Sequence, residues 1–150
     1  MARRGGGARC PSEVQDVEWI MSEKKVLVAE DQADIRGLIA FSLRFVGYEV
    51  IEAVDGQDAV AKARAERPDI ILLDVRMPTM NGYEACSLLK AEDSTRDIPV
   101  IFLSARGQET EIKRGLELGA EEYILKPFAP DELYRRVGSI LEQPDWQEEP

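Results

Sequence analysis

The chain has 150 residues and a formal net charge of −10, with 44% hydrophobic and 32% charged residues. These proportions are typical of one soluble globular domain, and the acidic balance argues against direct binding of DNA or RNA, because the phosphates would be repelled. Two cysteines cannot form a disulfide framework, and no apolar run approaches the ~20 residues of a membrane span. We therefore expect a cytoplasmic protein with no contact to a membrane.

Residues 1–22 have no hydrophobic periodicity and contain three consecutive glycines, so we expect this segment to be disordered. Met21 would be a natural start just before the first strand, which makes the segment a candidate for a mis-assigned start, and we assign it no function. One globular domain is expected over residues 23–142. An acidic tail over residues 143–150 follows it.

Short runs rich in Val, Ile and Leu alternate with stretches of helical spacing along the expected domain. The expected strands end near Asp31, Ala53, Asp74, Ser104 and Lys126. Apolar residues at helical spacing mark expected helices around 35–46, 56–66, 82–89, 112–116 and 133–141. This alternation is typical of an α/β fold with a buried parallel sheet.

The fourth expected helix has the weakest pattern. Only Ile112 and Leu116 mark its apolar face, and Gly107, Gly115 and Gly119 lower the intrinsic stability of any helix that contains them. A marginal helix beside a site would suit a conformational switch, whereas a frayed surface helix has the same pattern. Both interpretations stay open at this stage.

Polar side chains follow the apolar runs at the points where four of the expected strands end. Glu30 and Asp31 follow the first strand, Asp74 the third, Ser104 the fourth and Lys126 the fifth. Because the carboxyl ends of parallel strands form the binding edge of an open α/β sheet, these side chains are expected to converge. Carboxylates, a hydroxyl and an ammonium describe a site for a divalent cation and a phosphoryl group, with Asp74 as the acceptor.

The order and spacing of these groups resemble the receiver domain of bacterial two-component response regulators, in its single-domain chemotaxis type, over Lys25–Leu141. Met77–Pro78, Asn81–Gly82, Ala105 and Tyr123 stand at the supporting positions of that family. The resemblance implies a flavodoxin-like, doubly wound sheet of five parallel strands in the order 2-1-3-4-5, with helices on both faces.

The resemblance also implies a Mg²⁺ site. The direct ligands would be Asp31, Asp74 and the backbone carbonyl of Arg76, with Glu30 acting through water. Mg²⁺ suits this set because it takes hard oxygen ligands and keeps several waters.

The remaining site residues would contact the phosphoryl group or respond to it. The resemblance places Lys126 and Ser104 on the phosphoryl oxygens, with a cis peptide before Pro127, and makes Ser104 and Tyr123 the switch residues. Arg76 and Arg106 flank the phosphoryl site, where they could shield or pair with the acyl phosphate, or point to solvent.

The sequence contains no histidine, so any phosphohistidine in its chemistry must belong to a partner. We expect a single-domain response regulator that accepts a phosphoryl group on Asp74 from a histidine kinase or phosphotransfer protein. It would signal through a downstream target protein or by onward phosphotransfer. It would not be an enzyme beyond catalysing its own phosphorylation and dephosphorylation.

Two other classes of function share part of this pattern. A Mg²⁺-dependent phosphatase with an aspartate nucleophile shares this fold, but Arg76 stands where its Asp-x-Asp motif needs a second carboxylate. A receiver-like scaffold that is never phosphorylated would not need the complete set of Glu30, Asp31, Asp74, Ser104 and Lys126.

Overall fold

The computed structural model describes residues 24–105 and 109–141, which form one parallel sheet with helices on both faces. The strands are β1 (Lys25–Ala29), β2 (Glu49–Ala53), β3 (Ile70–Asp74), β4 (Val100–Ser104) and β5 (Glu122–Leu125). All neighbouring strands pair in parallel, in the order β2-β1-β3-β4-β5. The expected order is therefore confirmed. The segment 1–22, Arg106 and the tail 143–150 lie outside the described residues.

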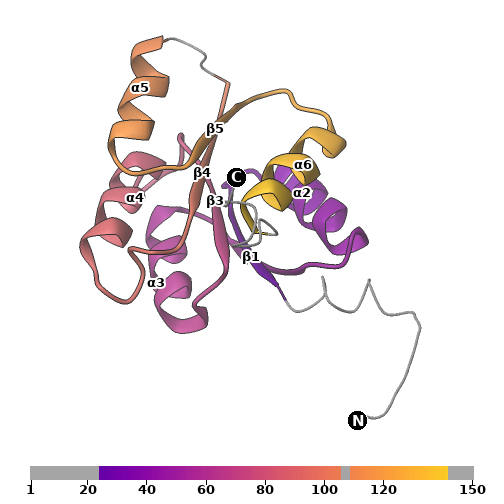
Figure 1. Cartoon of the computed structure of the whole chain (residues 1–150), viewed down its shortest axis with the longest axis horizontal. Coiled ribbons are helices and arrows are strands. Elements are labelled where there is room, and N and C mark those ends of the chain that lie inside the picture. Colours follow the sequence, from indigo (N-terminus) through magenta and orange to yellow (C-terminus); the bar gives the residue numbers. More distant parts are fainter. Residues whose placement is uncertain (1–23, 106–108, 142–150) are drawn as a thin grey trace, which may run out of the picture.

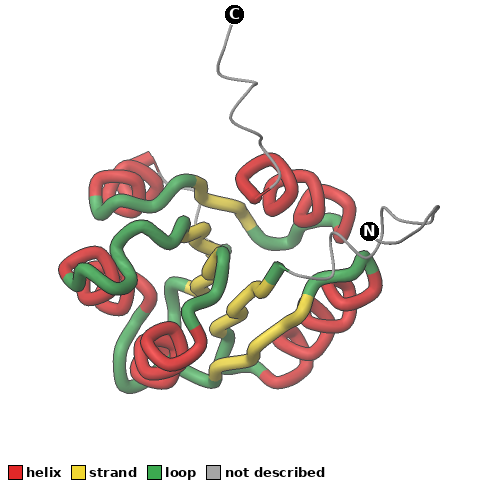
Figure 2. The backbone as a smooth tube through the Cα atoms, turned by 60° about the horizontal axis from the view of Figure 1, so that its bottom comes forward, coloured by secondary structure: helices red, strands yellow, loops and turns green. Residues whose placement is uncertain are grey.

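The helices form two layers around the sheet (Figures 1 and 2). They are α2 (Ala33–Phe45), α3 (Gly56–Glu66), α4 (Gly82–Ala91), α5 (Glu109–Glu117) and α6 (Pro130–Leu141). Figure 1 shows α2 and α6 on one face and α3, α4 and α5 on the other. No helix of the described part of the chain is long and apolar enough to cross a membrane.

The central strands are apolar because both of their faces are covered. Leu27 and Leu73 pack on the side of α3 and α4, while Val28 and Leu72 pack on the side of α2 and α6. All four side chains are fully buried. Burial of each such side chain contributes about 1.5–3 kcal/mol, so β1 and β3 are fixed at the centre of the domain.

Local sequence determines where two of the helices begin. Asp55 accepts a hydrogen bond from the backbone N–H of Asp58 at the start of α3, and Asn81 forms a capping box with Glu84 at the start of α4. Gly82 opens α4 within van der Waals range of β3, where a Cβ would lie 2.4 Å from the Asp74 carbonyl oxygen. A side chain at this position would push the helix away from the site.

Helix α5 exists, although its sequence pattern was the weakest. Gly115 faces the sheet, and a Cβ on it would lie 2.8 Å from the Phe102 ring and 3.1 Å from the Tyr123 ring. The glycine lowers helix stability but lets α5 pack closely on β4 and β5. Its position is therefore set by packing, which the pattern of apolar residues does not record.

Candidate functional site

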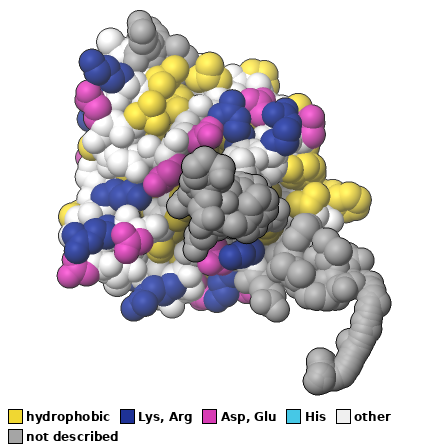
Figure 3. All heavy atoms as spheres, viewed as in Figure 1, with side chains coloured by type: hydrophobic (Ala, Val, Ile, Leu, Met, Phe, Trp, Pro, Cys, Tyr) yellow, Lys and Arg dark blue, Asp and Glu magenta, His cyan; other side chains and the backbone are white. Residues whose placement is uncertain are grey.

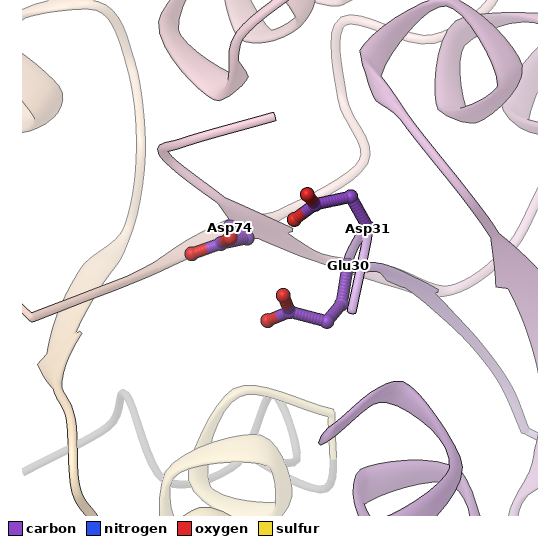
Figure 4. A group of neighbouring side chains, drawn as sticks. All are labelled: Glu30, Asp31 and Asp74. Carbon is purple, nitrogen blue, oxygen red and sulfur yellow. The ribbon is translucent and has the colours of Figure 1, made fainter. Parts of the chain in front are cut away.

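Three carboxylates project into the same space from the ends of β1 and β3 (Figure 4). Asp74 is the last residue of β3 and Glu30 follows β1, and their residues are 5% and 1% exposed. Asp31, the next residue, is exposed to solvent. One carboxylate oxygen from each of the three lies within 4.8 Å of the other two.

Lys126 brings a positive charge to this cluster from the end of β5. Its Nζ donates hydrogen bonds to Glu30 Oε1 at 2.8 Å and to Asp74 Oδ1 at 3.1 Å. The backbone N–H of Lys126 also donates to the Ser104 carbonyl, which joins the ends of β5 and β4. The peptide between Lys126 and Pro127 is cis, as the resemblance implied.

The site carries more negative charge than its single ammonium can offset. The pKa of Asp74 is raised to about 6, first by burial and then by the charge of Glu30 and, less, of Asp31, while Lys126 opposes the shift. Burial disfavours the charged form of Lys126, but its hydrogen bonds and charge interactions with Glu30 and Asp74 outweigh this, so the pKa of Lys126 is raised. A divalent cation would relieve the remaining repulsion.

A cavity of about 330 Å³ opens onto these groups. Its polar lining consists of Glu30, Asp31, Gln32, Asp74, Arg76, Ser104 and Lys126. The structure thus brings together the predicted phosphoacceptor, lysine, hydroxyl and metal ligands. Hard oxygen ligands around a cavity open to water fit Mg²⁺, which retains part of its hydration shell. The side chain of Arg76 is exposed.

Arg36 contacts the acidic loop and was not singled out from the sequence. Its Nη1 donates to the Glu30 carbonyl at 2.8 Å, and its Nε donates to Glu52 Oε1 at 3.2 Å. Its side chain is only 16% exposed. An arginine in the first turn after an acidic loop was a possible signal, but only the structure shows that its side chain points back to the loop.

A second group of residues surrounds the predicted switch residue Tyr123, which is half-buried. The Tyr83 hydroxyl lies 3.3 Å from the Tyr123 hydroxyl and donates to Glu111 Oε1 at 2.9 Å. Burial and then these two hydrogen bonds raise the pKa of Tyr83. Tyr83 thus joins α4, α5 and β5. Its 28-residue separation from Glu111 explains why no local pattern indicated the contact.

Comparisons with known proteins agree with this arrangement. The family model of the response regulator receiver domain matches residues 26–138. The chain is 45% identical over 118 residues to the phosphate regulon transcriptional regulatory protein PhoB of Klebsiella pneumoniae, covering 79% of this chain and 52% of that protein. It thus spans about half the length of the curated relatives it matches.

Solved structures give the same result at the level of the fold. The chemotaxis protein CheY4 of Vibrio cholerae superposes with a TM-score of 0.75 at 33% identity, covering 79% of this chain and 98% of that one. The receiver domain of a Pseudomonas aeruginosa sensor histidine kinase superposes with a TM-score of 0.74, at the same identity and coverage. That structure has a magnesium ion coordinated in its active-site cleft.

Proposed function

The chain belongs to the response regulator receiver domain family of two-component signalling, and from this premise we propose that it is a phosphorylation-operated signalling module. Asp74 would accept a phosphoryl group from a phosphohistidine of a histidine kinase or phosphotransfer protein. The observation that carries the proposal is the buried Asp74 carboxylate, within 3.1 Å of Lys126 and clustered with Glu30 and Asp31.

In the proposed reaction, an oxygen of Asp74 forms a bond to phosphorus while the bond from phosphorus to the donor imidazole nitrogen breaks. The electron pair of the broken bond stays on that nitrogen. The pKa of Asp74, at about 6, leaves most of the carboxylate ionised at neutral pH and able to attack. Lys126 and Ser104 would then contact the phosphoryl oxygens through charge-assisted hydrogen bonds.

Mg²⁺ would be held by Asp31, Asp74 and the backbone carbonyl of Arg76, with Glu30 contributing through a bound water. When bound, the ion would neutralise charge on the transferred phosphoryl group. The carboxylate spacing and the open cavity support this ligand set. We propose no turnover of an external substrate, because the site's groups act on Asp74 itself.

The face of α2 beside the site supports docking of a protein donor. Leu38, Phe41 and Phe45 are 63%, 67% and 78% exposed, and hydrophobic side chains gather at the edge of the molecule where α2 lies (Figure 3). A groove of about 420 Å³ between α2 and the segment 126–133 is lined mainly by apolar residues, with Ser42 and Lys126 as its polar members. Lys126 lines both this groove and the phosphoryl cavity, so a docked donor would be beside Asp74.

The output would follow from a shift in a pre-existing equilibrium of the surface formed by α5, β5 and α6. Ser104 precedes α5 and Lys126 follows β5, so drawing both toward a phosphoryl group would move this surface. A differential interaction of a few kcal/mol is enough to make a minor state the major one. The changed surface would bind a downstream target protein, or Asp74 would pass its phosphoryl group onward.

The proposal is tested with acetyl phosphate, which needs no partner protein. Intact-mass spectrometry of the full chain should show one added phosphoryl group in the presence of Mg²⁺ and none with a chelator. Asp74→Asn should remove the added mass, whereas Asp97→Asn, which changes an exposed loop carboxylate, should not. Persistence of the added mass in Asp74→Asn would overturn the assignment.

A further inference from the structure

The Arg36 guanidinium donates a hydrogen bond of 2.8 Å to the carbonyl of Glu30, the residue that begins the acidic pair. From this contact and its surroundings we infer that Arg36 is a positioning residue for the metal site, acting through the backbone that carries Glu30 and Asp31. The inference rests on the proposed function, since it takes Mg²⁺ to be the ligand of this cluster.

The loop between β1 and α2 lacks the side-chain cap that fixes comparable loops in this domain. The N-cap residue of α2, Gln32, makes no side-chain capping hydrogen bond, whereas Asp55 and Asn81 cap α3 and α4. A cap normally sets the angle at which a loop enters its helix. In α2 the loop is restrained by a long hydrogen bond of 3.3 Å from the Gln32 N–H to Glu30 Oε2 and by Arg36, one turn into the helix, which reaches back to the loop.

Glu30 is held at each of its polar groups. Its backbone N–H donates to the Ala53 carbonyl at 3.1 Å, and its carboxylate accepts from Lys126 at 2.8 Å. Its carbonyl accepts from Arg36, and the residue is 1% exposed. A buried carbonyl without a partner would turn toward water and move the adjoining peptide, which leads directly to Asp31.

Arg36 is itself held from β2, on the opposite side of the loop. Its Nε donates to Glu52 Oε1 at 3.2 Å, and the Glu52 carbonyl accepts from Lys62 at 2.6 Å. Glu52 Oε2 pairs at 3.3 Å with Arg44, which lies two turns further along α2. Arg36 and Arg44 therefore share one carboxylate, but of these two arginines Arg36 donates to the acidic loop, whereas Arg44 donates to the Val50 carbonyl.

Charge and positioning predict opposite effects on Mg²⁺ binding. Removing a cation from the neighbourhood of the site should strengthen the attraction of a divalent ion, in proportion to the lost repulsion. Removing a residue that fixes the backbone of the ligands should weaken binding, since partners that orient metal ligands typically contribute a factor of about 10–100 to affinity. The sign of the change therefore separates the two roles.

The experiment is a calorimetric titration of the full chain with MgCl₂, comparing Arg36→Met with Arg44→Met as the matched control. Both variants lose one positive charge and one pairing with Glu52. We expect Arg36→Met to bind Mg²⁺ about tenfold more weakly than the wild type. Arg44→Met should bind as tightly as the wild type or slightly more tightly.

Arg36→Lys keeps the charge but presents a single ammonium in place of the guanidinium fork, so it should weaken binding by about threefold. If Arg36→Met does not fold, the same titration with Arg36→Lys tests the inference. At saturating Mg²⁺, Arg36→Met should regain most of the wild-type rate of phosphorylation by acetyl phosphate, because the acceptor and Lys126 are unchanged. Equal or tighter Mg²⁺ binding in the Arg36 variants would overturn the inference. A wild-type chain that binds no Mg²⁺ would instead overturn the proposed function.

Discussion

The edge of the sheet that carries the carboxylates and the surface around α5 are built in different ways. Glu30 follows β1 and Asp74 ends β3, which are central strands buried on both faces, and every polar group of Glu30 has a partner. Helix α5 contains Gly115 and packs on β5, the four-residue edge strand. The groups proposed to bind the phosphoryl group would thus lie on β1 and β3, which resist movement. The surface proposed to change on phosphorylation would lie on α5 and β5, whose movement should cost less free energy.

The largest effect should come from removing a direct ligand at the rigid edge. Asp31→Ala should lower Mg²⁺ affinity by about 100-fold or more, because it would remove a proposed direct ligand of the ion. Glu30→Ala should lower it by about tenfold, since a water-mediated contact is lost while repulsion between carboxylates also falls. Calorimetric titration measures both values, and equal losses would show that the two residues have been assigned to the wrong positions around the metal.

The second prediction concerns the route by which a donor reaches this edge. Phe41→Ala together with Leu38→Ala should slow phosphorylation by a protein phosphodonor about tenfold or more, because two exposed apolar contacts are lost. The same variant should react with acetyl phosphate at the wild-type rate. Leu88→Ala, which removes an exposed leucine from α4 on the opposite face, is the control. An equal loss with both phosphodonors would place the defect in the site itself.

Much of the sheet edge that carries Glu30, Asp31 and Asp74 could be predicted from the sequence, because its signals lie in short continuous stretches of the chain. Strands buried on both faces leave continuous apolar runs, so the positions of Asp74 and Ser104 at strand ends follow directly from the pattern. The strand order came from the resemblance to the family, and the structure confirms it. Lys126 and Glu30 are 96 residues apart in the sequence, and the hydrogen bond between them depends on that strand order.

The residues that support the site could not be predicted in the same way. Arg36 and Tyr83 each act through a few side-chain hydrogen bonds, whose direction depends on side-chain conformation and not on periodicity. From the sequence, Gly115 could be interpreted only as a residue that weakens α5. Its role in letting α5 pack closely on the sheet depends on the rings of Phe102 and Tyr123, which face it in the structure. These contacts join elements far apart in the sequence, where composition and spacing carry no signal.

The third prediction tests whether ionisation of Asp74 destabilises the folded protein when no metal is bound. The pKa of Asp74 is about 6 in the folded state and about 3.9 in an unfolded chain, so its ionisation costs stability. This cost is absent below pH 4, grows as the pH rises from about 4 to 6 and is complete above that. Asp74→Asn removes it, so the variant should be more stable than the wild type at pH 7.5.

The gain for Asp74→Asn should be about 1–2 kcal/mol, less than a shift of two pKa units would give, because the cavity is open to water, which screens the charge. Urea denaturation in a chelator at pH 4 and pH 7.5 measures it, and the two proteins should converge at pH 4. Saturating Mg²⁺ at pH 7.5 should shrink or reverse the difference. A gain of the same size at both values of pH would mean that ionisation of Asp74 is not its cause.

The smallest effect should come from loosening the surface around α5. Tyr83→Phe keeps the ring, which packs edge-on against Phe102 with 5.1 Å between the ring centroids. It removes the hydroxyl that joins Glu111 to Tyr123. The loss of about 1 kcal/mol of hydrogen bonding should speed amide hydrogen exchange in α5 about fivefold while leaving β1 and β3 unchanged. Tyr134→Phe on α6 is the matched control and should leave exchange in α5 at the wild-type rate.

Amide hydrogen exchange can also test the proposed change in the surface formed by α5, β5 and α6, with beryllofluoride as a mimic of the phosphoryl group. In the wild type it should alter exchange most between Ser104 and Leu141, since Ser104 and Lys126 would contact the mimic and lie at the ends of β4 and β5. In Tyr83→Phe the change around α5 should be smaller, because that helix is already partly released before the mimic binds. If exchange changed mainly in α2 and α3 instead, the output surface would lie elsewhere and Tyr123 would be a packing residue.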